Sequence, residues 1–294
     1  MGAAKISYND LQERLNDLPT LPTVVQELNR IIADPMSTIK DVEEVMLQDQ
    51  SLTTKVLTLA NSAYYAIPGG VSNLSRAIGF LGFDTVHQLV IAASVFSTLK
   101  ITGETSFDLI QFWKHSIGVA IVAESIAAKI GHKQSSDLFT CGLVHDMGKI
   151  AIAMLDKEIL EDISAYANAE NMSFIQAERA LENMPHTRIG KILSEKWRLP
   201  LPVQNCVLYH HEANLQLRSG LSTEMHQYVD IVYLANCLVG TIRFGNSGYK
   251  KAPKLPKEIL GRLNIKPEEI GAMVKDFKEP LQKAESFLKI LESG

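Results

Sequence analysis

An adjacent pair of ionisable residues, His145 and Asp146, lies in an otherwise apolar stretch of the sequence. Leu143 and Val144 precede the pair, and Ile150 follows shortly after it. Burying two ionisable groups among apolar side chains is costly unless a partner neutralises them. A divalent metal ion is such a partner, because imidazole and carboxylate groups are ligands of first-row metals. The pair therefore raises the question of whether other histidines converge on it.

Further histidines lie on segments that could contribute to such a site: His115, His186, His210, His211 and, outside any motif, His226. A single histidine on a helix is as readily explained by burial beside a hydrogen-bond partner. The adjacent His210 and His211 could instead form a solvated helix end, where positive charge is favourable. His87 and His132 also belong to no motif, and we expect these two and His226 to be surface or structural residues.

The composition is that of a globular protein. The chain has 294 residues, of which 46% are hydrophobic and 21% are charged, and this length suits one large or two medium domains. The formal net charge is -4. This charge argues against a large basic surface, so nucleic acid is not an expected partner. A small basic run is expected to be a solvated face and consists of Lys250, Lys251, Lys254 and Lys257.

Cysteine usage and hydropathy indicate the compartment. The three cysteines, Cys141, Cys206 and Cys237, lie among apolar residues and form no CxxC pair. We therefore expect neither a disulfide framework nor a zinc–thiolate site, and a reducing cytoplasm fits this pattern. The first residues lack the apolar core of a signal peptide. The most apolar windows, such as residues 89–95, are too short to cross a membrane, so no membrane partner is expected.

Apolar residues recur at helical spacing along nearly the whole chain, which predicts an all-α protein. A linker at residues 102–105 divides an N-terminal helical bundle, residues 7–101, from a second helical region, residues 106–294, that includes the C-terminal helices. Leu11, Leu15 and Leu18 predict a short first helix. Thr38 and Asp41 have the spacing of a capping box. A helix over residues 137–155 is predicted to carry the His–Asp pair.

Several motifs in the same order resemble those of the HDOD (HD-related output) domain family of bacteria. They are LPTLP at 18–22, QDQSLT at 48–53, LANSAYY at 59–65, AIGFLG at 77–82, FWKHS at 112–116, GLVHDMGK at 142–149, WRLP at 197–200 and the pair His210–His211. The resemblance extends from about residue 18 to about residue 236. It implies an all-helical fold with a core like that of the HD phosphohydrolases after the linker. It also implies a signalling or regulatory role.

The resemblance to HD hydrolases implies a set of metal ligands. His115 corresponds to their first histidine, and His145 and Asp146 correspond to their His–Asp pair. Their terminal aspartate is replaced by Asn236 in this chain. An amide is a weaker ligand than a carboxylate and carries no charge, which argues against a tight hydrolytic metal site.

The related HD-GYP phosphodiesterases imply further correspondences. Their downstream histidines correspond to His186, His210 and His211, and the lysine after their His–Asp pair corresponds to Lys149. Gln111 stands where they carry an acidic residue. No Gly-Tyr-Pro signature follows the histidine pair, so hydrolysis of cyclic dinucleotides is not supported.

Two functions remain open, together with a scaffold that binds no ligand. The first is a regulatory HDOD protein that acts through contacts with a separate, unidentified signalling partner. Its degenerate pocket would hold a divalent metal such as Fe, Mn, Ni or Zn in a structural or sensory site. The second is an active metal-dependent phosphohydrolase or phosphodiesterase. In that enzyme the metal lowers the pKa of a water that attacks phosphorus, Lys149 stabilises phosphate charge, and His210 or His211 donates a proton or binds metal. Lys149 could equally be a solvated side chain.

Overall fold

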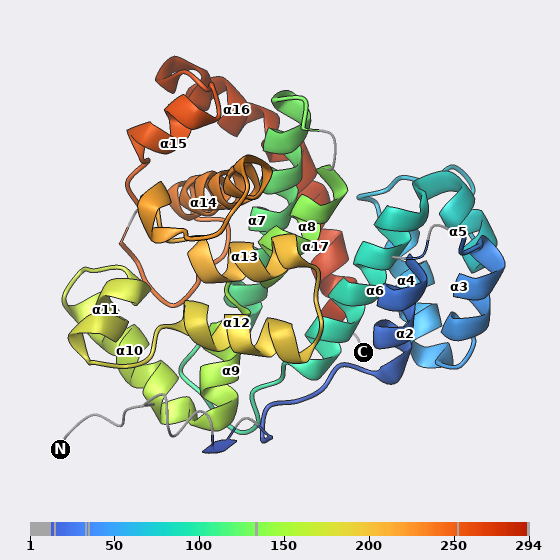
Figure 1. Cartoon of the computed structure of the whole chain (residues 1–294), viewed down its shortest axis with the longest axis horizontal. Helices are drawn as coiled ribbons and strands as arrows, with labels where there is room; N and C mark the ends of the chain where they lie inside the picture. Colours follow the sequence, from blue (N-terminus) through green and yellow to red (C-terminus); the bar gives the residue numbers. More distant parts are fainter. Residues whose placement is uncertain are drawn as a thin grey trace. The chain divides into compact units, whose positions relative to one another are not determined.

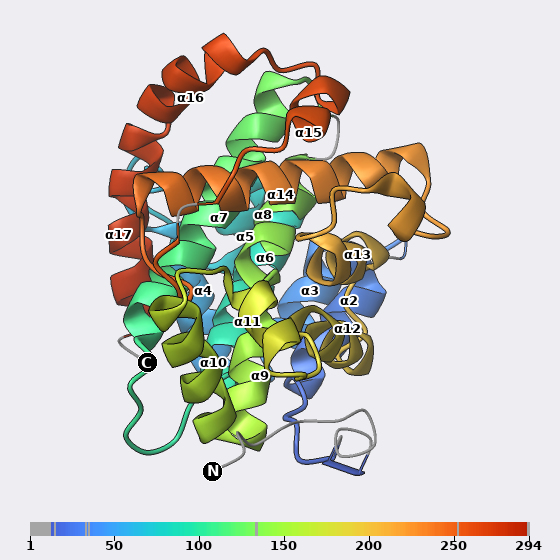
Figure 2. The same cartoon turned by 90° about the vertical axis from the view of Figure 1, so that its left-hand side faces the viewer.

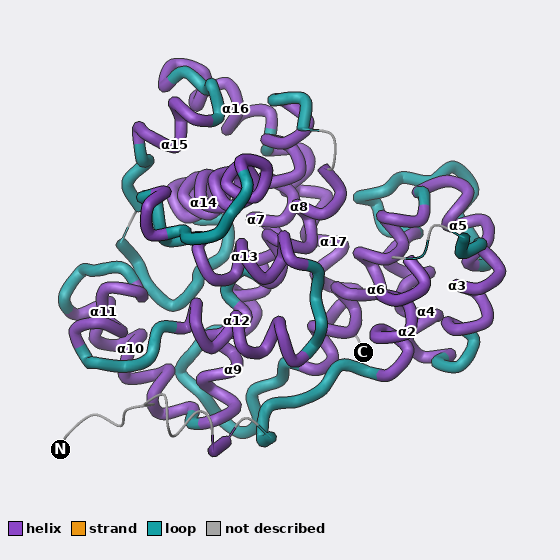
Figure 3. Tube along the Cα trace, viewed as in Figure 1, coloured by secondary structure: helices purple, strands orange, loops and turns teal. Residues whose placement is uncertain are grey.

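The computed structural model describes residues 13–14, 16–32, 34, 36–132, 135–251 and 253–292. These residues form helices joined by turns and loops, and none of them belongs to a strand (Figures 1 and 3). The all-α prediction is therefore confirmed. The predicted first helix rests on Leu11 and Leu15, which lie outside the described residues.

The chain divides into two compact units. A larger unit consists of Met1–Pro19 and Leu99–Phe277, and a smaller unit consists of Thr20–Thr98 and Lys278–Gly294. These limits differ from the predicted domains, residues 7–101 and 106–294, at both ends of the chain. The last residues group with the smaller unit, and the residues before Thr20 group with the larger one. At the N-terminal end the reason is visible in two hydrogen bonds. Lys196 Nζ donates to the Leu18 carbonyl at 2.6 Å, and Trp197 Nε1 donates to the Pro19 carbonyl at 2.8 Å.

The smaller unit is a bundle in which α6 contacts α2, α4, α5 and α17. The predicted capping box at the start of α3 is present, since Thr38 and Asp41 bond each other's backbone N–H groups. Helix α17 belongs here because its buried Phe287 lies beside Tyr64, with ring centroids 6.4 Å apart. The helices are α2 Thr23–Ile32, α3 Ile39–Met46, α4 Gln50–Ala60, α5 Leu74–Leu81, α6 Phe83–Thr98 and α17 Lys278–Glu292.

The larger unit is built around α7, which packs against α8 and α14. Figure 2 shows α14 crossing α7 and α8. Helix α12 packs against α9 and α13, and α10 packs against α9 and α11. The helices are α7 Leu109–Lys129, α8 Ser135–Val144, α9 Met147–Leu155, α10 Lys157–Ala169, α11 Phe174–Ala180, α12 His186–Lys196, α13 Leu201–Tyr209, α14 Thr223–Ile242, α15 Lys257–Arg262 and α16 Ile270–Asp276.

The predicted helix over residues 137–155 is two helices. Helix α8 ends at Val144, α9 begins at Met147, and His145 and Asp146 form the turn between them. The backbone of Asp146, with φ -100° and ψ 8°, is not helical. The turn lies inside the unit, and both side chains of the pair are buried.

Among the described residues, one stretch is long and apolar enough by composition to cross a membrane, namely Asp137–Leu155. Within its most apolar 18-residue window, 94% of the residues are buried within the protein. Burial to this extent is typical of a core helix. Two shorter helices, Leu74–Leu81 and Phe83–Thr98, reach the required length only when taken together, and they are bent by 118° at their junction.

His87 in the smaller unit predicts how stability depends on pH. Its Nε2 atom lies 2.6 Å from Asn29 Oδ1, and burial lowers its pKa to about 4. In the unfolded chain the same group titrates near 6.5. Above pH 6.5 both states are neutral, whereas between pH 6.5 and 4 the unfolded state alone takes up the proton. His87 therefore removes stability as pH falls through this range, by on the order of 2 kcal/mol.

The measurement is urea unfolding of the wild type and His87→Gln at pH 7.5 and pH 5. Glutamine keeps an N–H donor for Asn29 but does not titrate. We expect the free energy of unfolding to fall more for the wild type than for the variant. Equal falls in both proteins would show that His87 has the same pKa in the folded and unfolded states.

Candidate metal centre

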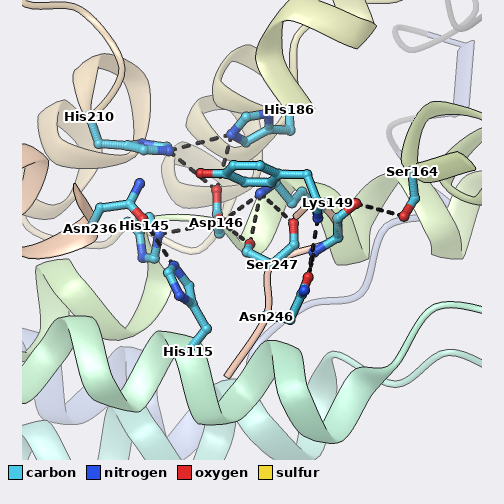
Figure 4. Close-up of polar contacts among 12 residues, drawn as sticks. His115, His145, Asp146, Lys149, Ser164, His186, His210, Asn236, Asn246 and Ser247 are labelled. Atoms are coloured by element: carbon cyan, nitrogen blue, oxygen red, sulfur yellow. Dashed lines mark hydrogen bonds and ion pairs between the residues drawn. The ribbon is translucent and has the colours of Figure 1, made fainter. Parts of the chain in front are cut away.

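The carboxylate of Asp146 lies at the centre of a buried cluster of histidines (Figure 4). Its Oδ1 atom is 3.1 Å from His186 Nε2 and 3.3 Å from His210 Nε2. Its Oδ2 atom is 3.3 Å from His145 Nε2. These four side chains are at most 1% exposed. The structure therefore brings together residues that are far apart in the sequence, since His145 and His210 are separated by 65 positions.

Several helix ends meet at this point. Asp146 precedes α9, His186 is the first residue of α12, and His210 directly follows α13. Gly148 allows α9 and α12 to meet closely, because a Cβ atom there would lie 1.9 Å from the carbonyl oxygen of His186. No other residue type would leave this space, so the glycine after the His–Asp pair positions His186 against Asp146.

The outer ring nitrogens of the three histidines are all held by oxygen acceptors. Nδ1 of His145 lies 2.7 Å from the Gly142 carbonyl, and Nδ1 of His210 lies 3.0 Å from the Val207 carbonyl. Nδ1 of His186 lies 2.8 Å from a carboxylate oxygen of Glu178. Because these oxygens accept, each Nδ1 carries the proton, and a neutral ring then presents its Nε2 lone pair to Asp146. Histidines that bind metals are commonly oriented in this way.

Glu178 is a functional residue that the sequence did not reveal. It is fully buried on α11, and its second carboxylate oxygen accepts from the backbone N–H of His186 at 2.7 Å. Two bonds from one carboxylate fix both the backbone and the ring of His186. The separation of eight residues, interrupted by a proline, matches no regular periodicity that could have indicated the contact.

The centre of the cluster is rich in lone pairs. The Nε2 atoms of His186 and His210 are only 3.4 Å apart, and both face Asp146 Oδ1. His145 Nε2 and Asp146 Oδ1 are buried without a hydrogen-bond partner. Such a group of acceptors is unfavourable unless a cation lies among them. The residues therefore fit a divalent metal, whose ligands would be imidazole nitrogens and the carboxylate.

Two overlapping sets of candidate ligands are present among the described residues. In one set, the ligand atoms of Asp146, His186, His210 and His211 all lie within 4.8 Å of one another. In the other, those of His115, His145 and Asp146 satisfy the same limit. Asp146 is common to both sets, so it would be a ligand in either of them. The sequence-predicted histidines thus converge, with the exception of His226.

His226 lies apart from this cluster on α14. Its carbonyl accepts from Arg218 Nη1 at 3.4 Å, and it belongs to neither ligand set. Arg218 is in turn bound to the buried Asp230 at 2.8 Å. His226 is therefore associated with a buried ion pair away from the candidate ligands.

Asn236 lies beside the cluster but in a different role from a ligand. Its Oδ1 atom is 3.0 Å from His115 Nε2. An amide oxygen accepts, so in this arrangement His115 Nε2 carries a proton and its lone pair is on Nδ1. The amide of Asn236 therefore orients the His115 ring by a hydrogen bond. A carboxylate at position 236 would add a negative charge there.

Burial and charge set the protonation of the cluster. Burial opposes ionisation of Asp146, but Lys149 and the neighbouring histidines hold its pKa well below the usual value. Burial lowers the pKa of His115 to about 3 and that of His210 to about 4. Burial also lowers the pKa of His186, but Glu178 and Asp146 outweigh this effect and the pKa is raised overall. The cluster therefore consists of an ionised carboxylate with neutral imidazoles and one ring that favours a proton.

Lys149 is buried, so the alternative in which it is a solvated side chain is wrong. Its Nζ donates to Asp146 Oδ2 at 2.7 Å, to Ser247 Oγ at 2.7 Å and to the Ser247 carbonyl at 3.0 Å. An ammonium group has three protons, and three acceptors account for all of them. The rings of Phe174 and Tyr249 lie 4.6 and 5.5 Å from Nζ. In this arrangement Lys149 neutralises Asp146 and has no proton left for a phosphate.

Ser247 is the second residue that the sequence did not reveal. Its hydroxyl donates to Asp146 Oδ2, and it lies on the loop after α14. The loop is fixed to α7, because Asn246 N donates to the Gln111 carbonyl at 2.9 Å. Gly245 has φ +74°, and a Cβ atom there would lie 2.2 Å from the backbone nitrogen of His115. The glycines around Ser247 predicted a loop, but not its contact with residues a hundred positions earlier.

Comparison with known proteins agrees with this fold. A family model, described as the HDOD domain, matches residues 18–213. The chain belongs to the HDOD domain family. The predicted family is therefore confirmed. The match includes every candidate ligand except Asn236, which lies beyond residue 213, as does Ser247.

Solved structures share the fold. An HDOD domain protein of unknown function from Geobacter sulfurreducens is 25% identical, with a TM-score of 0.70 and coverage of 97% of this chain and 98% of that one. A protein from Shewanella amazonensis, provisionally called a phosphohydrolase, is 23% identical, with a TM-score of 0.74 and coverage of 96% and 97%. A Marinobacter aquaeolei protein, provisionally called a signal transduction protein, is 19% identical, with a TM-score of 0.77 and coverage of 99% and 63%.

A curated relative is an uncharacterised protein of Treponema pallidum (strain Nichols), which is 26% identical over 262 residues. The alignment covers 88% of this chain and 48% of the relative. The chain therefore spans about half the length of the curated relative that it matches.

Gly148→Ala is expected to disrupt the centre. The added Cβ would clash with the His186 carbonyl and force α9 and α12 apart, so we expect a loss of about 3 kcal/mol in the free energy of unfolding. Gly271→Ala in α16 is the matched control, because no heavy atom lies within 4 Å of its added Cβ. Chemical denaturation of both variants checks the prediction. A Gly148→Ala protein as stable as Gly271→Ala would contradict the close packing of α9 on α12.

Proposed function

We propose that this chain is a regulatory HDOD module whose buried His–Asp centre binds a divalent metal ion in a structural or sensory role. The observation that carries the proposal is the group of Nε2 atoms directed at Asp146, each fixed from behind by a carbonyl or carboxylate oxygen. When bound, the metal supplies the positive charge that this buried group of acceptors lacks. The metal is Fe, Mn, Ni or Zn, since imidazole suits Fe, Ni and Zn and carboxylate suits Mn.

The protein groups around Asp146 support a role other than hydrolysis. Lys149 and Ser247 both bind Oδ2, so this oxygen already has protein partners. Asn236 supplies an amide where HD hydrolases have a carboxylate, and this lowers the negative charge available to a metal. Together these residues satisfy one oxygen of Asp146 and reduce the negative charge of the centre. A hydrolytic site needs open positions for water and substrate.

A metal-dependent phosphohydrolase is the second candidate, and a specific observation favours it. His211 Nε2 is buried without a hydrogen-bond partner, and His211 lines a cavity together with His210 and Asn236. The cavity thus reaches two of the candidate ligands. In a hydrolase the bound metal would polarise a phosphate, while His211 would hold or donate a proton at its Nε2 atom.

The regulatory proposal includes a separate signalling protein as partner and the cytoplasm as compartment. Nucleic acid and membranes are not part of it, since the net charge is -4. In the smaller unit, Met36 is 84% exposed, Leu47 is 65% exposed and Phe80 is 56% exposed. Large exposed apolar side chains of this kind are available for protein contacts.

Elemental analysis of protein purified without an affinity tag tests the metal centre. We expect stoichiometric metal in the wild type, and loss of that metal in His145→Ala because the variant lacks one directed Nε2 atom. His226→Ala is the matched control, because His226 belongs to neither ligand set. Circular dichroism confirms that each variant is folded. Wild-type protein that is free of metal after exposure to each of the four ions would overturn the proposed function.

Asn236→Asp separates the two candidate functions. The added carboxylate is expected to raise metal affinity at least about tenfold, through its charge beside His115. If the module is regulatory, phosphatase and phosphodiesterase turnover remain at background. Asn236→Ala serves as the control for loss of the amide. Turnover that rises together with metal affinity in Asn236→Asp would favour the hydrolase instead.

A further inference from the structure

A cavity of about 360 Å³ lies beside the His–Asp centre. One part of its wall is formed by His210, His211 and Asn236, which belong to the centre or contact it. Another part is formed by Tyr233 and Tyr249. Volumes of this size suit small-molecule ligands. The cavity therefore offers a ligand direct access to the edge of the centre.

The charged side chains of this cavity are all cationic. Arg179 comes from α11, and Lys251 and Lys254 come from the segment before α15. No carboxylate is found among the described residues that line the cavity. Acidic residues outnumber basic ones in the whole chain, 33 against 29. Cations that line a cavity without a carboxylate beside them in its wall, in an acidic protein, indicate a site for an anion.

A second cavity, of about 180 Å³, repeats this arrangement on the side of His115. Its charged lining residues are Arg243, Lys250 and Lys251, and its described lining again includes no carboxylate. Lys251 and Tyr249 line both cavities. The basic run that the sequence predicted as a solvated face thus divides, with Lys250, Lys251 and Lys254 at the cavities and Lys257 outside both.

We infer that the larger cavity binds a small molecule that carries a phosphate group, held by Arg179, Lys251 and Lys254. A guanidinium group and ammonium groups together match the charge and the geometry of phosphate oxygens. Tyr233, Tyr249 and Cys237 provide a less polar wall for the rest of the molecule. The inference rests on the proposed function in one respect, namely that occupancy of this cavity is the signal that the module senses.

The distribution of charge favours a small molecule over a polyanion. The cations of this site line cavities of limited volume, and the net charge of -4 would repel an extended nucleic acid. Two of the three cations, Lys251 and Lys254, also lie beyond residue 213, where the match to the family model ends. This phosphate site is therefore a property of the chain that the family match alone does not assign.

The test is isothermal titration of inorganic phosphate into the full chain at constant ionic strength. Arg179→Ala and Lys254→Ala each remove one cation from the cavity wall. Lys257→Ala is the matched control, because it removes an exposed lysine of the same basic run that lines neither cavity. We expect Kd to rise about tenfold in each cavity variant and less than about twofold in the control. Metal content, measured in parallel, is expected to be unchanged in all three.

The other outcomes separate this inference from the proposed function. If His145→Ala abolishes phosphate binding while Arg179→Ala and Lys254→Ala leave it intact, the anion binds the metal and the cationic site is wrong. If the wild type holds no metal but its phosphate affinity depends on Arg179 and Lys254, the phosphate site stands and the metal proposal fails. A wild type that binds no phosphate at millimolar concentration would overturn the inference.

Discussion

The larger unit is organised around one ionised carboxylate that has no contact with solvent. A charge in this position is tolerated only when protein groups or ions offset it. Asp146 receives a hydroxyl proton from Ser247 and an ammonium proton from Lys149 on one oxygen, while histidine nitrogens surround the other. Each of these partners comes from a different part of the chain. The packing of α7, α9, α12, α13 and the loop after α14 can therefore be understood as the structure needed to assemble them.

The partners differ in what they do for this charge. Lys149 and Ser247 offset it permanently, because their own hydrogen bonds fix them in place. A neutral imidazole does not offset it, since its lone pair faces the carboxylate, as Nε2 of His186 and His210 face Oδ1. The centre thus has one oxygen that the protein satisfies and one that it leaves for a cation. This difference between the two oxygens of Asp146 is compatible with a site that has the candidate ligands of a hydrolase but serves the proposed regulatory role.

The sequence predicted which histidines meet at Asp146 better than it predicted the residues that orient them. His145 and Asp146 could be found because an ionisable pair in an apolar run is conspicuous, and His115, His186 and His210 because they fall in motifs of a known family. Glu178 and Ser247 could not be found, because their roles depend on contacts between helices and loops that no local pattern encodes. Lys149 was assigned to a phosphate because its position in the motif is visible in sequence, whereas its three acceptors are not.

The fold shows the same division. Helical spacing of apolar residues predicted most helices, and the capping box at Thr38 marked one helix start correctly. The break at His145–Asp146 was missed, since the flanking residues are equally apolar on both sides of it. The placement of α17 in the smaller unit was also missed. Its amphipathic pattern shows that one face is buried, but not which partner covers that face.

The loop after α14 has a consequence for where the domain ends. Residue 213 closes the family match, yet Ser247, Asn236 and the anchor of the loop on Gln111 all involve chain beyond that point. A fragment cut at the end of the recognisable motif would expose one oxygen of Asp146 to solvent and release the ring of His115. The segment that matches the family model is thus shorter than the segment needed to build the centre.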